Sequence, residues 1–146
     1  KNRARGMLLN CRGTTVVENN VFRSPGAALL FEGDACYWFE QGGVSDCTIR
    51  NNVFDNCRFG VWGKAIIDVA AGIKEDFETS RYNRNIKIYG NTFKVFDDCP
   101  LLNIYCVDGL KWYDNKIIKT DAYPPREYKE PARFVIKHSD NVEISE

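Results

Sequence analysis

The chain has 146 residues, which suits one domain with a substantial core. Its 20 Lys and Arg residues balance its 20 Asp and Glu residues, so the formal net charge is zero. A neutral chain gives no electrostatic reason to expect nucleic acid or an anionic membrane as a partner. No apolar run reaches the roughly 20 residues that a membrane-spanning helix needs. We therefore predict no nucleic-acid partner and no membrane span.

The six cysteines are more typical of free thiols than of a disulfide framework or a metal site. Cys11, Cys47, Cys57 and Cys106 lie in or beside apolar runs, where a free cysteine behaves as a small hydrophobic residue. No C-x-x-C pair occurs, and His138 is the only histidine, so the spacing of a zinc site is missing. We predict mostly buried free thiols and no bound metal, and the redox compartment stays open.

Internal repetition is the strongest signal in the sequence. Four similar segments occupy residues 14–22 (TTVVENNVF), 47–54 (CTIRNNVF), 85–93 (NIKIYGNTF) and 109–117 (GLKWYDNKI), and a partial copy, NVEIS, occupies 141–145. Each full copy is a short β-branched or aromatic run that leads to a shared asparagine: Asn20, Asn52, Asn91 and Asn115. We expect these amides to stack in successive coils, with the asparagine providing the left-handed backbone of a tight corner. This explanation is structural and gives them no catalytic role.

A second type of short apolar run precedes each copy, at residues 6–11, 27–32, 65–70, 100–107 and 133–138. Such runs, bounded by turn residues, are typical of strands buried in a parallel sheet. Helical periodicity is weak and confined to 74–80. The pattern predicts an all-β chain, a right-handed parallel β-helix of about five coils that forms a single domain over residues 1–146. Ile49, Phe54 and Ile88 are predicted core residues.

Insertions interrupt the repeat at defined places. The shared asparagines are separated by 32, 39 and 24 residues, so the first two coils carry extra residues. Both extras, 33–43 and 71–83, lie at the same corner between the two strand types. Insertions at one corner of adjacent coils stand side by side, often on the binding face. A third insertion, 121–130, leaves from the opposite corner, and its two prolines and mixed charges predict a solvated surface loop.

The first insertion combines acids with aromatic rings in FEGDACYWFEQGG, residues 31–43. Carboxylates accept hydrogen bonds from sugar hydroxyls, and aromatic rings pack on the apolar face of a pyranose. Glu32, Asp34, Trp38 and Glu40 are therefore candidate substrate-binding residues. The alternative is that the rings only pack the long loop against the domain.

Two further acidic positions have both a structural and a functional interpretation. Asp68 lies within the run AIIDVA, aligned with Phe31 and Asn103 of the neighbouring coils, and must point outward or find a partner. If it points outward, it joins the candidate substrate-binding surface. Asp97-Asp98 could serve as a general acid and base, but the following Cys99-Pro100 favours a role in a turn.

The segments RARGMLL (3–9), VVENNVF (16–22) and especially FEGDACYWFEQGGVSDCTIRNNVF (31–54) resemble the C-terminal β-helical portion of glycoside hydrolase family 110. The resemblance implies a secreted, periplasmic or cell-surface exo-acting α-1,3-galactosidase that inverts configuration with carboxylates and without a metal or cofactor. It also implies a longer parent chain, with catalytic aspartates upstream of this segment. Glu32, Asp34, Trp38 and Glu40 would lie near the sugar, whose terminal α-galactosyl group is the expected ligand. We expect residues 1–146 alone to be inactive.

A different class of function stays open at this point: a non-catalytic β-helix module for carbohydrate binding or surface adhesion. Paired aspartates in further coils upstream would favour the enzyme. Either way, a solenoid end exposes an unpaired strand edge, so we expect end-to-end association unless that edge is covered.

Overall fold

The computed structural model describes residues 4–32, 42–60, 62–73 and 77–146. The described residues contain strands and turns but no α-helix. The strands are β1 (Met7–Leu8), β2 (Thr14–Glu18), β3 (Val21–Phe22), β4 (Leu29–Glu32), β5 (Asp46–Arg50), β6 (Val53–Asp55), β7 (Ile67–Ala70), β8 (Asn83–Tyr89), β9 (Thr92–Val95), β10 (Leu102–Tyr105), β11 (Val107–Tyr113), β12 (Lys116–Lys119), β13 (Phe134–Lys137) and β14 (Asp140–Ile144).

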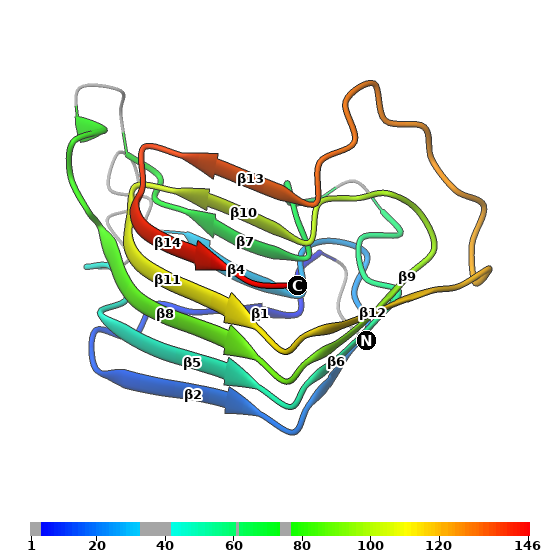
Figure 1. The fold of residues 1–146 in the computed structure, drawn as a ribbon, viewed down its shortest axis with the longest axis horizontal. Helices are drawn as coiled ribbons and strands as arrows, with labels where there is room; N and C mark the ends of the chain where they lie inside the picture. Colours follow the sequence, from blue (N-terminus) through cyan, green and yellow to red (C-terminus); the bar gives the residue numbers. More distant parts are fainter. Residues whose placement is uncertain (1–3, 33–41, 61, 74–76) are drawn as a thin grey trace.

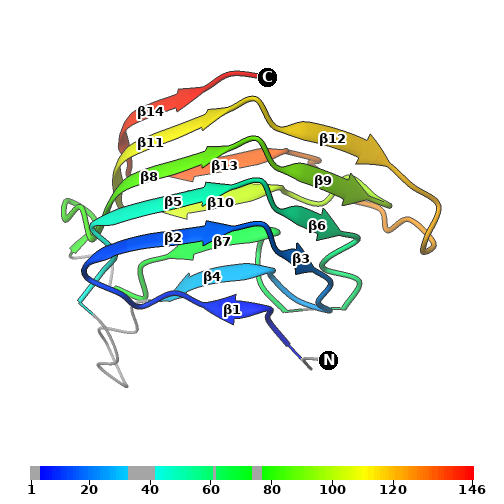
Figure 2. The ribbon, with the colours of Figure 1, turned by 90° about the horizontal axis from the view of Figure 1, so that it is seen from below.

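These strands form three parallel sheets that wrap around one core (Figure 1). Sheet A has the order β1-β4-β7-β10-β13, sheet B the order β14-β11-β8-β5-β2, and sheet C the order β12-β9-β6-β3. Neighbours in each sheet are three strands apart in the chain, so the chain visits A, B and C in turn and returns one level higher (Figure 2). Parallel neighbours lie about 4.8 Å apart. The molecule is therefore all-β, with parallel sheets stacked as in a parallel β-helix.

The repeated asparagines form the predicted ladder at the corner between sheets B and C. The Nδ2 of Asn20 donates to the Oδ1 of Asn52 (3.2 Å), Asn52 donates in the same way to Asn91 (3.0 Å), and Asn91 to Asn115 (2.9 Å). Each acceptor oxygen also receives the backbone N–H of the asparagine in the preceding coil. The ladder thus satisfies backbone donors that the corner would otherwise leave unpaired.

The prediction of a left-handed backbone at these asparagines is wrong by one residue. The positive φ angles fall on the preceding residues: Asn19 (58°), Asn51 (55°), Gly90 (63°) and Asp114 (52°). Asn, Asp and Gly are the residues that adopt this region most readily. The corner therefore uses two adjacent positions, one for the backbone turn and the next for the amide ladder.

The core is a column of side chains between the three sheets. Phe22, Phe54 and Phe93 stack with ring centroids 5.4 and 4.5 Å apart, and Trp112 continues the column 5.0 Å from Phe93. The predicted core residues Ile49, Phe54 and Ile88 are each fully buried. Inward-facing residues at equivalent places in successive coils explain why short apolar strands suffice to build this fold.

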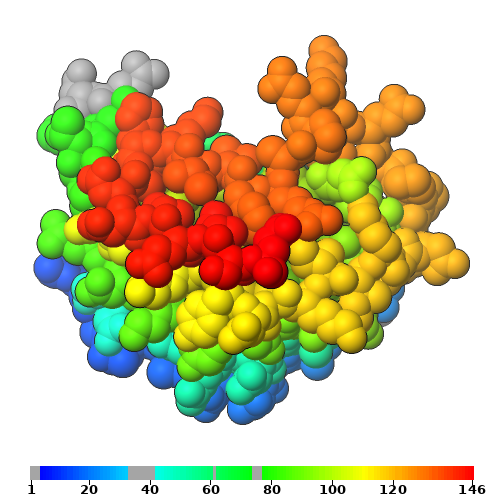
Figure 3. Space-filling model, viewed as in Figure 1, coloured from blue at the N-terminus to red at the C-terminus, as the bar shows by residue number. Residues whose placement is uncertain are grey.

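The positions of two insertions are confirmed. The segments 33–45 and 71–82 both connect sheet A to sheet B, in the adjacent coils β4–β5 and β7–β8. The third, 120–133, connects sheet C to sheet A between β12 and β13. Figure 3 shows it in orange, rising on the opposite side from the green residues near 77–80, with the surface hollowed between them.

The weak helical signal at 74–80 corresponds, in its described part, to a turn in which the N–H of Ser80 donates to the carbonyl of Phe77 (2.9 Å). No helix in the described part of the chain is long and apolar enough to cross a membrane.

Candidate functional site

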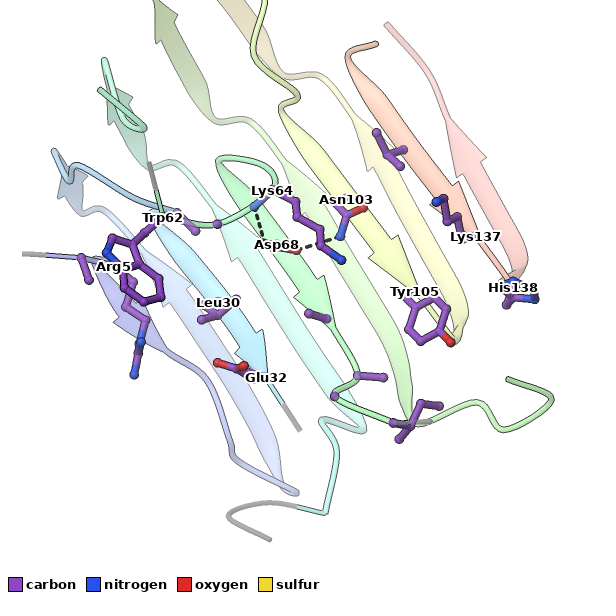
Figure 4. A pocket seen from close by; sticks show the side chains of 18 of the residues that line it. Arg5, Leu30, Glu32, Trp62, Lys64, Asp68, Asn103, Tyr105, Lys137 and His138 are labelled. Atoms are coloured by element: carbon purple, nitrogen blue, oxygen red, sulfur yellow. Dashed lines mark hydrogen bonds between the residues drawn. The ribbon is translucent and has the colours of Figure 1, made fainter. Parts of the chain in front are cut away.

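A groove of about 930 Å³ lies on the outer face of sheet A, beside residues 71–73 and Glu78 of the second insertion. Figure 4 shows its lining side chains rising from successive strands of that sheet. The described residues that line it include Arg5, Leu30, Glu32, Trp62, Lys64, Asp68, Glu78, Asn103, Tyr105, Lys137 and His138.

Strand alternation explains why polar residues reach this face. Phe31, Val69 and Ile104 point into the core and are fully buried, so their neighbours in each strand point outward. The parallel register then aligns Leu30 with Asp68 and Asp68 with Asn103. Two residues further along, on the same face, Glu32 lies beside Ala70 and Tyr105 lies beside Lys137.

This register corrects the sequence alignment of Asp68. Its partner in β4 is Leu30, whereas Phe31 pairs with Val69; the predicted alignment with Asn103 is confirmed. The error is one residue, and in a strand one residue reverses the face. An alignment with the buried Phe31 would have turned Asp68 into the core, but Asp68 lines the groove.

Asp68 is only 3 % exposed, and both of its carboxylate oxygens accept protein hydrogen bonds. The Oδ2 atom accepts from the backbone N–H of Lys64 (2.7 Å), and Oδ1 accepts from the Nδ2 of Asn103 (2.8 Å). Its charge is thus stabilised by donors from the preceding turn and from the adjacent strand.

A second polar cluster occupies the β10–β13 side of the groove. The Tyr105 hydroxyl donates to the Oε1 of Glu78 (2.6 Å), and the Nε2 of His138 lies 3.3 Å from the same oxygen. The hydrogen bond to the Glu78 carboxylate raises the pKa of Tyr105 above its usual range. With this raised pKa, Tyr105 stays protonated and donates a hydrogen bond at neutral pH. Glu78 belongs to the 71–82 insertion, so this cluster attaches that insertion to sheet A.

Of the residues predicted from sequence, Glu32 and Asp68 line this groove. Glu32 is exposed there, whereas Asp68 is buried. Asp34, Trp38 and Glu40 lie outside the described residues.

The sequence interpretation missed Trp62, Glu78, Tyr105 and His138. Tyr105 follows Asn103 by two positions, so strand alternation from Asn103 was a usable signal for it. Trp62 and Glu78 come from connections between strands, where no periodic pattern indicates direction.

Asp97 and Asp98 are not arranged as a catalytic pair. Asp97 is buried, and its Oδ1 accepts the N–H of Cys99 (3.1 Å), the hydrogen bond of an Asx turn. Its Oδ2 accepts from the Nε of Arg126 (2.7 Å), while Asp98 pairs with Lys119 at the surface. This geometry agrees with the turn interpretation, and neither residue lines the sheet A groove.

No family model matches the chain. Curated relatives do: alpha-1,3-galactosidase A of Shewanella woodyi is 41 % identical over 86 % of this chain and 20 % of its own length. Alpha-1,3-galactosidase B of Bacteroides thetaiotaomicron is 40 % identical over 87 % of this chain and 21 % of its own length. Alpha-1,3-galactosidase B of Akkermansia muciniphila is 37 % identical over 93 % of this chain and 18 % of its own length. The chain thus spans about a fifth of the length of these relatives, and the resemblance noted from its motifs is confirmed.

Proposed function

Because this chain is a relative of the α-1,3-galactosidases, we propose that the protein containing it is an exo-acting glycoside hydrolase that removes terminal α-1,3-linked galactose. In this proposal residues 1–146 supply part of the sugar site. The observation that carries it is the groove on sheet A, which is of ligand size and combines acids, an amide and aromatic rings beside residues of the second insertion.

The chemistry of the groove suits a sugar. Glu32 offers a solvent-accessible carboxylate that accepts hydrogen bonds from vicinal hydroxyls. The Tyr105 ring and the exposed Trp62 ring offer flat apolar surface for the C–H groups of a pyranose. Asp34, Trp38 and Glu40 follow Glu32 directly in the chain and are proposed as further substrate contacts.

Catalysis is assigned to residues outside this segment. An inverting glycosidase needs two carboxyl groups about 6.5–9.5 Å apart, one as the acid and one as the base that activates water. Asp97-Asp98 is committed to a turn and an ion pair, and Asp68 to two internal hydrogen bonds. We therefore propose that the acid and the base come from further coils of a longer chain and that residues 1–146 alone are inactive.

The same proposal includes a right-handed β-helix of about five coils and a secreted, periplasmic or cell-surface location. The outermost strands carry exposed apolar side chains, among them Val21 on β3 and Ile136 on β13. Unpaired edges with such side chains favour contact with further coils or end-to-end association.

The test is a hydrolysis assay of the full-length protein, and of residues 1–146 separately, against α- and β-linked galactosides. We expect galactose release from α-1,3-linked substrates by the full-length protein alone, with the β-anomer appearing first by NMR. Galactoside binding without hydrolysis would instead support a non-catalytic carbohydrate-binding module. Release by residues 1–146 alone would place the catalytic groups in this segment.

A further inference from the structure

Trp62 stands at the rim of the groove with most of its side chain exposed. Its exposed fraction is 61 %, compared with 2 % for Trp112 in the core. In Figure 4 it lies beside Arg5 at the β1 end of the groove, on the same side as Leu30 and Glu32. An exposed ring at the edge of a polar groove is placed where it can pack on a ligand bound there.

The connection that carries Trp62 is held firmly although the ring is exposed. Arg58, which is 9 % exposed, donates from its guanidinium to the carbonyl of Lys64 (2.9 Å), so it joins the two ends of this connection. The Arg126 guanidinium donates to the carbonyl of Gly60 (2.8 Å) from outside. The N–H of Gly60 donates to the carbonyl of Pro25 (2.7 Å) in the preceding coil.

The backbone at Trp62 and Gly63 also lies close to the preceding coil. A Cβ atom on Gly26 would lie 2.7 Å from the Cβ of Trp62, and one on Gly63 would lie 2.8 Å from the Cβ of Ala27. Gly63 has a φ of +82°, which a residue with a side chain adopts only with strain. The exposed ring thus projects from a backbone that is packed and hydrogen-bonded to the preceding coil, and such anchoring lowers the entropy cost of binding to the ring.

Asp68 connects this segment to the floor of the groove. Its carboxylate accepts the N–H of Lys64, two residues after Trp62, and the side-chain amide of Asn103 on the adjacent strand. Because Asp68 is only 3 % exposed, little of its carboxylate is accessible to a ligand. Its geometry is that of a support for the turn, whereas Glu32 in the same groove is exposed.

We propose that Trp62 is a stacking platform for a galactosyl ring and that Asp68 is a positioning residue that holds this platform and makes no bond to sugar hydroxyls. The inference deepens the proposed function, on which it rests, and reassigns one of its candidate residues. The axial hydroxyl of galactose leaves a continuous apolar patch on one face of the ring, which matches a flat indole. The exposed carboxylate of Glu32 can then accept hydrogen bonds from the hydroxyl edge of the same sugar.

The experiment measures the affinity of the full-length protein for methyl α-galactoside by calorimetry, together with steady-state kinetics and melting temperatures. Trp62→Ala should weaken binding roughly 2- to 13-fold, the range of an aromatic contact, and Trp62→Phe should restore most of it. Melting temperatures should stay close to wild type because the ring is exposed. Phe77→Ala is the matched control: this ring is 59 % exposed, belongs to an insertion and does not line the groove.

The role of Asp68 is tested by a double-mutant cycle. Asp68→Asn should weaken binding and change the fluorescence and acrylamide quenching of Trp62 in the sugar-free protein, measured against Trp62→Phe. In the Trp62→Ala background the same change should have almost no further effect on affinity, because both variants remove one contact. Additive losses would mean that Asp68 binds the sugar itself, which would overturn its positioning role.

Two different results would overturn the stacking role of Trp62 and the proposed galactosidase function. Wild-type affinity in Trp62→Ala, with or without a lower melting temperature, would overturn the platform while leaving the galactosidase intact. A wild-type protein that neither binds nor hydrolyses any α-galactoside would overturn the proposed function and the platform together.

Discussion

Arg126 and Asp97 form an ion pair that fastens the 121–130 segment to the rest of the solenoid, with 2.7 Å between Nε and Oδ2. The Asp97 side chain is fully buried, and the Arg126 guanidinium lies over the rings of Phe96 and Tyr128. The sequence predicted a solvated loop here, and most of its residues are indeed exposed or half-buried. Arg126 and Tyr128 nevertheless reach inward to Asp97, which composition alone does not reveal.

Removing this pair should destabilise the fold. Arg126→Met leaves a buried carboxylate without its cation and should lower the free energy of unfolding by about 3 kcal/mol, the lower end for a broken buried pair because Arg126 is partly exposed. Urea unfolding of both proteins measures the difference. Lys119→Met is the control, since its pair with Asp98 is exposed on both sides and should contribute less than about 1 kcal/mol. Equal losses in the two variants would contradict the prediction.

The pH dependence of stability provides a separate test of the same pair. Burial raises the pKa of Asp97, but the hydrogen bonds from Arg126 and from the N–H of Cys99 outweigh it, so the pKa lies below the usual 3.8. A depressed carboxyl pKa stabilises the fold above the unfolded value and loses that contribution as pH falls through the folded one. The stability difference between wild type and Arg126→Met should therefore be full at neutral pH and shrink as pH falls into the acidic range, because burial without Arg126 raises the pKa of Asp97 and the variant protonates it first. A difference that is constant down to pH 2 would exclude the carboxylate as its source.

The asparagine ladder predicts a graded effect along one row. Asn52 is 1 % exposed and donates to the carbonyls of Val17 (2.9 Å) and Arg50 (3.0 Å) as well as to Asn91. Asn52→Ala leaves these groups unpaired in the interior and should cost at least about 2–3 kcal/mol. Asn20→Ala removes the same type of side chain at an exposed end of the row and should cost under about 1 kcal/mol. Chemical denaturation of the two variants decides, and a similar cost at both positions would mean that the amide row is dispensable.

Repetition made most of the fold predictable, whereas the site depended on what interrupts repetition. The ladder, the core column and the corner of the two insertions follow from residues that recur in every coil. Trp62, Glu78 and Arg126 occur once each, in connections where direction is set by tertiary contacts rather than by strand period. Cys11 shows the same limit: an adjacent apolar run predicted burial, but β1 ends at Leu8 and the side chain is exposed.

Thiol reactivity should follow this difference in exposure. Hydrogen bonds from the Thr15 hydroxyl and the backbone at Gly13 lower the pKa of Cys11, while burial raises the pKa values of Cys47 and Cys99 to about 12. Because the thiolate is the reactive form, iodoacetamide at pH 7.5 should modify Cys11 first among the described cysteines. Peptide mass spectrometry over a time course identifies the order. Early modification of Cys47 would contradict the burial of its side chain on β5.

The last prediction concerns Glu32, the exposed carboxylate of the groove. Glu32→Gln in the full-length protein keeps the side-chain size and removes the charge. If Glu32 accepts a hydrogen bond from the sugar, the loss is about 1.5–3 kcal/mol, or roughly ten- to 150-fold in kcat/KM on an α-1,3-galactoside. The melting temperature should be unchanged, because the Glu32 side chain is exposed. Glu143→Gln makes the same change on β14, where the carboxylate pairs with Lys111 at the surface of sheet B, and should leave kinetics unaltered.

Asp34→Asn and Trp38→Ala in the same assay extend the test to the inserted segment that follows Glu32. Wild-type kinetics in Glu32→Gln would remove this carboxylate from the sugar site, and equal losses in Glu32→Gln and Glu143→Gln would point to a general effect of charge rather than to a contact.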